Sequence, residues 1–108
     1  MTLDSNRLLL ELEKARREIN RAIINPEIRE LSLEELQPML ELVAHVRAAY
    51  VSEFLEIAST TRNIPSPEQI DRLAGLRRAF DELVAAANAV ETMISRGYLD
   101  VRSNSHKA

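Results

Sequence analysis

The stretch from Gln37 to Ser59 constrains the fold of this chain more than any other part, because its apolar residues cover most of a helix surface. On a helical wheel at about 100° per residue, these apolar side chains fill an arc of roughly 240°, whereas a surface helix typically has an apolar stripe of about 100°. Polar side chains gather in one narrow stripe, made of Glu41, His45, Ser52, Glu56 and Ser59, and only Arg47 and Glu53 interrupt the apolar arc. Such a helix must be covered on at least two sides.

Composition favours an all-α fold in a single domain. The chain has 108 residues with only 2 glycines and 4 prolines, while hydrophobic residues make up 45% and charged residues 29%. Few turn-forming residues and many helix-forming residues are typical of long helices joined by short loops. We expect one domain over residues 1–101 and a disordered polar tail over residues 102–108. A lone three-helix unit of this size leaves apolar surface uncovered, and a second copy is one way to cover it.

The spacing of apolar residues predicts an antiparallel bundle of three long helices, over residues 5–24, 33–60 and 67–96. In the first helix, Asp4 or Ser5 is the expected N-cap. Pro26 ends this helix, because the residue before a proline avoids helical geometry. Its apolar residues alternate at spacings of four and three: Leu8, Leu12, Ala15, Ile19 and Ala22.

Capping residues place the ends of the other two helices. Ser32 and Glu35 have the spacing of a capping box before the second helix, and Ser66 and Gln69 have the same spacing before the third. Gly97 is the expected C′ glycine after the third helix, because a helix often ends on a residue with left-handed geometry.

Two regions leave alternatives open. Pro38 either kinks a nearly continuous second helix, which is the interpretation we favour, or marks the start of a new helix after a short turn. The conformation of residues 25–36 is not specified by the pattern. Because the third predicted helix is longer than the first, its end either packs on this connector and on residues 98–101 or extends into a neighbouring subunit.

Residues suited to catalysis or metal binding are scarce, and we expect a protein that is not an enzyme. The chain has no cysteine and 2 histidines, and it contains neither a nucleophile elbow nor a glycine-rich phosphate loop. Glu41 and His45 lie four residues apart on one helix face, where they could share a metal ion. A single pair of this kind on a polar stripe is more often solvated, so we predict no metal site and no cofactor.

Arginine residues form a basic patch on the first predicted helix, made of Arg16, Arg17 and Arg21. This patch supports an alternative function, a nucleic-acid-associated regulatory protein. Acidic residues lie beside the patch, and ion pairs along the helix explain it adequately. The formal net charge of −3 also gives no general attraction to a polyanion. Nucleic acid is therefore the weaker alternative.

The wide apolar arc of the second helix is either core or interface. Tyr50 and Phe54 are ordinary core of a three-helix bundle in one interpretation, and part of a surface that joins two copies in the other. Our leading hypothesis is a non-enzymatic protein-interaction or scaffolding module that forms a homodimer or docks a heterologous protein partner. The predicted interface residues are Val46, Tyr50, Phe54, Ile57, Phe80, Leu83 and Ala87.

The sequence also indicates a compartment. The N-terminal residues lack the basic start and unbroken apolar segment of a signal peptide, and no run approaches the ~18 apolar residues of a membrane span. The absence of cysteine is consistent with a reducing environment. We expect a cytoplasmic protein with no membrane partner.

Overall fold

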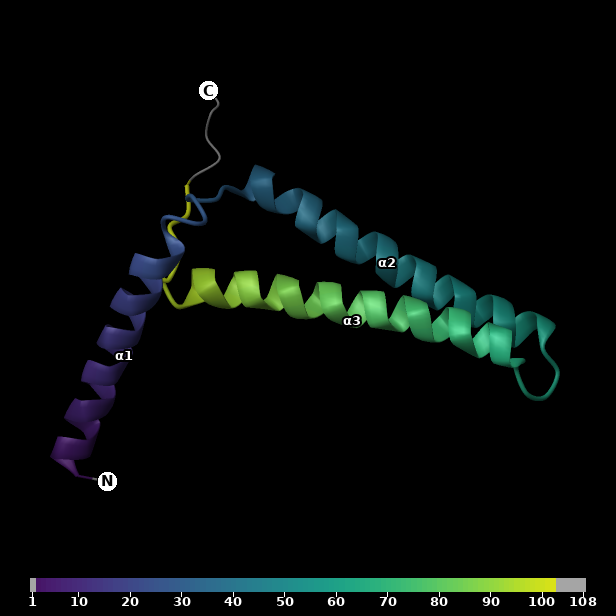
Figure 1. Cartoon of the computed structure of the whole chain (residues 1–108), viewed down its shortest axis with the longest axis horizontal. Helices are drawn as coiled ribbons and strands as arrows, with labels where there is room; N and C mark the ends of the chain where they lie inside the picture. The colour runs from purple at the N-terminus through teal and green to yellow at the C-terminus, as the bar shows by residue number, and fades with distance from the viewer. Residues whose placement is uncertain (1, 103–108) are drawn as a thin grey trace. The chain divides into compact units, whose positions relative to one another are not determined.

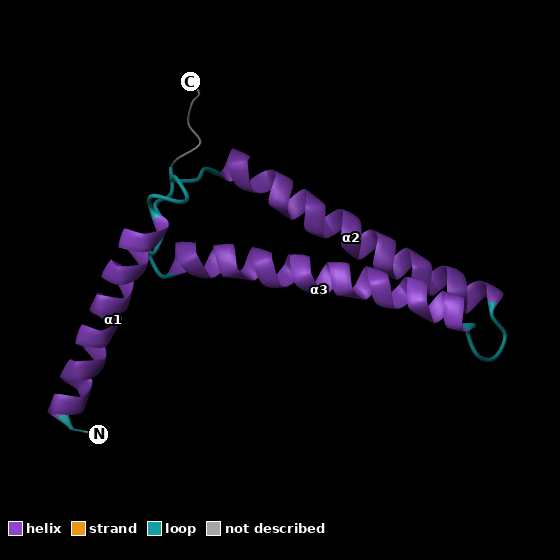
Figure 2. Cartoon of the chain, in the orientation of Figure 1, coloured by secondary structure: helices purple, strands orange, loops and turns teal. Residues whose placement is uncertain are grey.

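The computed structural model describes residues 2–102 and contains three α-helices, α1 (Leu3–Ile24), α2 (Leu33–Thr60) and α3 (Pro67–Ser95), as Figures 1 and 2 show. The predicted all-α, three-helix fold is confirmed. Between residues 2 and 102 the only extended pairing is an isolated bridge between Leu31 and Val101, so the described chain has no strand.

The first helix begins earlier than its predicted N-cap. Thr2 is the N-cap, with extended backbone angles, and its hydroxyl accepts a hydrogen bond from the Ser5 backbone N–H at 3.1 Å. The prediction of Asp4 or Ser5 as N-cap is therefore wrong. Both residues lie in the first turn, where the Asp4 carboxylate interacts favourably with the positive end of the helix dipole.

The second helix starts at the predicted capping box. The Glu35 carboxylate accepts from the Ser32 backbone N–H at 2.9 Å, and the Glu35 N–H donates to the Ser32 hydroxyl at 3.4 Å. Pro38 lies inside the helix, which continues without interruption for 28 residues. The alternative of a short turn followed by a new helix is therefore wrong.

The third helix has capping contacts at both ends. The Gln69 side chain accepts from the Ser66 N–H at 2.8 Å, and the Gln69 N–H donates to the Ser66 hydroxyl at 3.1 Å. At the other end, Gly97 has φ of 74° and the Tyr98 N–H donates to the Met93 carbonyl at 2.8 Å. Together with the bond from Gly97 N–H to Ile94 O, at 3.1 Å, this is a Schellman motif.

The two glycines of the chain are expected to respond oppositely to alanine. Gly97→Ala should lower the free energy of unfolding by about 1 kcal/mol, because a side chain is strained at positive φ. Gly75→Ala should raise it by about 1 kcal/mol, because Gly75 is helical and no atom lies within 4 Å of an added Cβ. Urea unfolding followed by circular dichroism measures both changes. Equal effects of the same sign would contradict the left-handed C′ geometry.

The chain divides into two compact units, of which the second is Leu36–Ala89. This unit, the α2/α3 hairpin, contains most of α2 and α3 lying side by side in opposite directions (Figure 1). Most half-buried and buried residues of its two helices repeat at alternating spacings of three and four, and we call these the hairpin seam; Val84, also half-buried, lies beside it. The seam consists of Leu36, Met39, Val43, Val46, Tyr50, Glu53 and Ile57 on α2, and of Gln69, Leu73, Leu76, Phe80, Leu83 and Ala87 on α3.

The other unit combines Met1–Glu35 with Val90–Ala108. Within it, Leu31 pairs with the segment after α3: its N–H donates to Asp100 O at 3.1 Å, and its carbonyl accepts from the Arg102 N–H at 2.8 Å. Tyr98 and Leu99 are buried here, with 8% and 3% exposure. Residues 98–102 therefore pack on the connector through Leu31, and the predicted packing of the end of the third helix on the connector stays a prediction.

The first helix and Arg102 are the parts of this unit that differ from the predictions. None of the 22 residues of α1 is buried, and the predicted α1 seam residues Leu8, Leu12 and Ile19 are all exposed. Arg102, placed in the predicted tail, is anchored by its backbone and by a side-chain bond to Glu35 at 2.9 Å. The rest of that tail lies outside the described residues, and the single-domain organisation stays a prediction.

Candidate interaction surface

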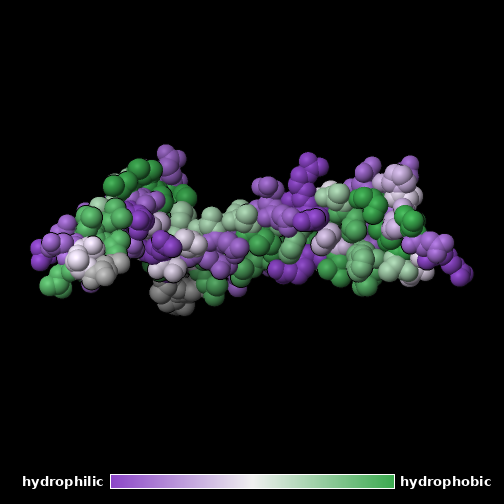
Figure 3. Space-filling model, turned by 90° about the horizontal axis from the view of Figure 1, so that it is seen from below, coloured by the Kyte–Doolittle hydropathy of each residue, from purple (hydrophilic) through white to green (hydrophobic). Residues whose placement is uncertain are grey.

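Several large apolar side chains of the α2/α3 hairpin are exposed. On α2, Leu40, Val51, Phe54 and Leu55 are between 46% and 60% exposed, and on α3 Ile70 is 46% exposed. Figure 3, which views the chain from the α3 side, shows apolar residues gathered toward the loop end of the hairpin. The seam therefore uses only part of the apolar arc of α2, and a second part faces outward.

Three of these α2 residues, Leu40, Val51 and Phe54, belong to a regular stripe beside the seam. Leu55 lies farther round the helix, and Leu42, which is 52% exposed, lies on the other side of the seam. On α2 the stripe repeats at spacings of four and three and lies about 40–120° around the helix from Tyr50. On α3 a matching stripe lies about 60–120° from Phe80 in the same rotational sense. We call the two stripes together the open face: Leu40, Ala44, Arg47, Val51, Phe54 and Ala58 on α2, and Ile70, Ala74, Arg77 and Asp81 on α3.

The antiparallel arrangement brings the two stripes to the same side of the hairpin. When two helices run in opposite directions and face each other, residues turned from the contact in the same rotational sense lie on the same face. An observed contact agrees with this geometry. Glu53, at the edge of the seam, and Arg72 are turned from the Tyr50–Phe80 contact in the opposite sense on their helices, and their side chains meet at 3.2 Å. The ion pair marks the face opposite to the open face.

An open groove with a volume of about 450 Å³ lies along this part of the hairpin. Its apolar lining comes from Tyr50, Ile70, Leu73 and Ala74. Its charged lining comes from Arg77, Arg78, Asp81 and Glu82, of which Arg77 and Asp81 pair with each other at 3.4 Å. Apolar residues next to charges of both signs suit a protein surface that carries both kinds of group.

Aromatic contacts hold the middle of the hairpin. The rings of Tyr50 and Phe80 are stacked with centroids 6.1 Å apart and an interplanar angle of 16°. The Arg47 guanidinium carbon lies 5.4 Å from the Phe80 ring centroid, within the range of a cation–π interaction. These contacts set which residues of α2 lie level with which residues of α3.

The predicted interface residues divide between the seam and the open face. Phe54 is on the open face, where it is 55% exposed. The other six, Val46, Tyr50, Ile57, Phe80, Leu83 and Ala87, lie in the hairpin seam. Contact of any of these residues with a partner stays a prediction. The prediction did not include Leu40, Val51 and Ile70 as interface residues. Leu40 and Val51 are part of the wide apolar arc of α2, but the sequence does not show which part of that arc meets α3.

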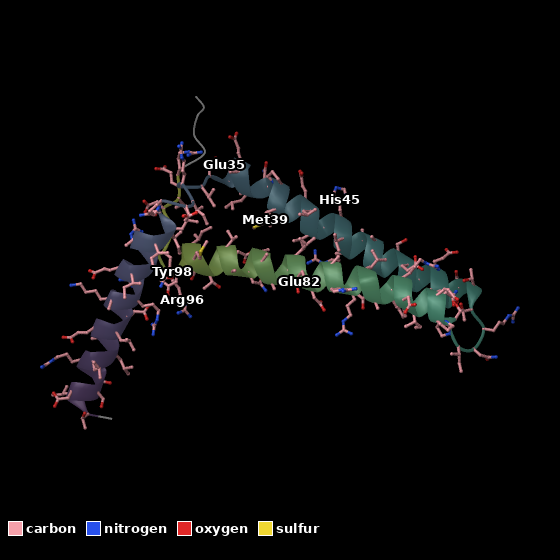
Figure 4. All side chains as sticks on the ribbon, in the orientation of Figure 1. Glu35, Met39, His45, Glu82, Arg96 and Tyr98 are labelled. Carbon is pink, nitrogen blue, oxygen red and sulfur yellow. The ribbon has the colours of Figure 1, made fainter. Side chains whose placement is uncertain are left out.

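The polar stripe of α2 lies away from the seam. Glu41 and His45 are exposed, and in Figure 4 His45 points away from α3 whereas Met39 points toward it. Between residues 2 and 102, no group of three or more histidine and acidic residues has an arrangement that could hold a metal ion.

The three predicted nucleic-acid-binding arginines of α1 form bonds within the chain. Arg16 pairs with Glu13 at 2.7 Å, and Arg17 donates to the backbone carbonyl of Arg96 at 3.4 Å. Arg21 donates to the carbonyl of Gly97 at 2.8 Å and pairs with Asp100 at 2.5 Å. Figure 4 shows Arg96 and Tyr98 beside α1. Nucleic-acid binding through this patch stays a prediction, and these contacts give it no support.

The chain was compared with known proteins: no family model, no curated protein and no solved structure matches it. In the part of the chain that the structure describes, no helix has the length and apolarity needed to cross a membrane.

Proposed function

We propose that this chain is a non-enzymatic protein-interaction or scaffolding module of the cytoplasm that associates with a second copy of itself. The observation that carries the proposal is the open face of the hairpin, where Leu40, Val51 and Phe54 remain about half exposed. Soluble monomers rarely leave large contiguous apolar patches in water. Burying the exposed half of each such side chain would contribute on the order of 1 kcal/mol.

The spacing of the exposed residues adds support. Alternation of three and four residues on α2 is the pattern through which helices pack in coiled coils and helical bundles. A partner that presents another helical face could therefore cover the stripe with regular side-chain packing. The exposed apolar residues of α1, among them Leu8 and Ile19, offer a second helical surface of the same kind.

The mass of the chain in solution tests the proposal. Size-exclusion chromatography with multi-angle light scattering, run over a range of concentrations, is expected to give a mass about twice the 12.2 kDa of the chain. The mass should fall toward that of a single chain on dilution below the dissociation constant. A mass of one chain at every concentration up to the millimolar range would contradict self-association.

A further inference from the structure

We propose that the second copy packs its α2/α3 hairpin face to face on the open face, so that each α2 lies on α3 of the other copy. This inference rests on the proposed function and adds to it a surface, a symmetry and a register. The two-fold axis runs parallel to the helices and lies between the two hairpins. A two-fold axis is the commonest symmetry of soluble dimers, and it makes the same patch serve both copies.

The whole side of the hairpin on which the open face lies has the size that a stable dimer needs. The part of α2 in the hairpin, residues 36–60, is about 37 Å long, and two adjacent helices are about 20 Å wide. A face of these dimensions covers about 750 Å² on each copy, close to the ~800 Å² of a standard interface. The second copy therefore accounts for the whole exposed stripe rather than for one residue of it.

The register of this arrangement follows from contacts within one chain. Rotation about an axis parallel to the helices does not shift them along their length, so α2 meets the other α3 at the level where it meets its own. Within the chain, Tyr50 and Arg47 lie level with Phe80. Near the loop, Thr61 lies level with Gln69 and is hydrogen-bonded to it at 3.1 Å.

This register places a small side chain of α3 between two residues of the open face of α2. Counting along the two helices from the level of Tyr50 and Phe80, Phe54 lies level with Leu76 of the second copy, and Ala58 lies level with Arg72. Ala74 of the second copy therefore lies midway between Phe54 and Ala58. Alternation of large and small residues lets facing helices interdigitate without voids. Phe54 would also enter the groove whose apolar lining includes Ala74.

Charge complementarity favours this arrangement over the other two-fold dimer. The open face of α2 carries one charged residue, Arg47, and no acidic residue. In the proposed register Asp81 of the second copy lies between Arg47 and Val51, about 3 Å along the helix from the level of Arg47. The long Arg47 side chain reaches over that distance, and the two-fold axis repeats the contact. In the other two-fold dimer the axis is perpendicular to the helices, and α2 would lie on α2 of the second copy. The open-face stripe of that α2 has no carboxylate that could pair with Arg47. Pairing of opposite charges across an interface sets register and excludes competing arrangements.

A pair of charge reversals in the full-length chain tests this contact. Arg47→Glu alone and Asp81→Arg alone each place like charges opposite each other twice per dimer. Each is expected to raise the dimer dissociation constant at least about tenfold, measured by sedimentation equilibrium at about 0.1 M salt. Mixing the two variants in equal amounts should restore dimers. In the mixed dimer the two substituted side chains face each other with opposite charges, and the unsubstituted Arg47 and Asp81 form the second pair. If the substitutions weakened the dimer only by disturbing contacts within one chain, mixing the two variants would not restore dimers.

A second pair of variants tests the face itself. Phe54→Glu should also raise the dissociation constant at least about tenfold, because it places a charge in the apolar centre of the interface. Leu42→Glu is the matched control: Leu42 is 52% exposed, similar to Phe54, but on the wheel it lies toward the face marked by Glu53 and Arg72. It should change the constant by less than about twofold. Far-UV circular dichroism of each variant shows whether its helices are intact.

The possible outcomes separate this inference from the proposed function. A wild-type chain that stays monomeric contradicts both. A wild-type dimer that persists in Phe54→Glu, or that Leu42→Glu disrupts instead, contradicts the face. A dimer that depends on Phe54 but is insensitive to the two charge reversals, or is not restored by mixing them, contradicts the α2-on-α3 register while leaving self-association in place.

Discussion

Ile57→Ala is expected to lower the free energy of unfolding of the chain by about 3 kcal/mol, the size typical of removing a large buried aliphatic side chain. Ile57 is 5% exposed and lies in the hairpin seam near the loop. The substitution removes apolar contacts and leaves a cavity, because two helices joined by a short loop cannot move together freely at that end. Urea unfolding followed by circular dichroism, at one fixed protein concentration, measures the change.

Leu42→Ala is the matched control for this change. Leu42 is on the same helix, but it is 52% exposed and lies outside the seam. Its replacement is expected to lower the free energy of unfolding by less than about 0.5 kcal/mol, as for most surface substitutions. Equal losses for the two variants would show that the seam does not hold the hairpin together.

The helix boundaries could be predicted because the signals that set them are local. Ser32 and Glu35 are three residues apart, and a capping box needs no other part of the chain. The Schellman motif at Gly97 is equally local, because it needs a residue that tolerates positive φ at one position. The prediction of the α1 N-cap was wrong because Thr2, Asp4 and Ser5 all carry capping oxygens within one turn, and the sequence alone does not rank them.

The division of the α2 surface between seam and open face could not be predicted. The apolar arc of α2 is wide enough for two stripes, and Tyr50 and Phe54 lie only about 40° apart around the helix. The seam is also harder to identify because it contains a charged residue, Glu53, which is paired with Arg72 of α3. Which stripe of α2 meets α3 depends on how the two helices are rotated about their own axes when they pack. The residue pattern of one helix does not contain that rotation.

Contacts between distant parts of the chain could not be predicted from the sequence either. The bridge between Leu31 and Val101 joins backbone groups, which carry no side-chain signal of their partner. Arg21 was grouped with Arg16 and Arg17 as a basic patch because they are neighbours on one helix. Its bonds to Gly97 and Asp100 depend on the turn that ends α3, which lies 76 or more residues away along the chain.

Leu99→Ala is the second substitution with a large expected effect. Leu99 is 3% exposed and lies between the turn at Gly97 and the bridge to Leu31. Its truncation is expected to lower the free energy of opening this segment by about 3 kcal/mol. The backbone N–H groups of Leu31 and Arg102 donate across the bridge, so they report on that opening.

Hydrogen exchange followed by NMR measures this effect at individual residues. A loss of about 3 kcal/mol corresponds to roughly a hundredfold faster exchange of the Leu31 and Arg102 amides. Val101→Ala is the matched control, because Val101 forms the bridge through its backbone while its side chain is 58% exposed. It should change the two exchange rates by less than about threefold. If both variants accelerate exchange equally, burial of Leu99 is not what holds residues 98–102 on the connector, and the backbone bridge itself must hold them.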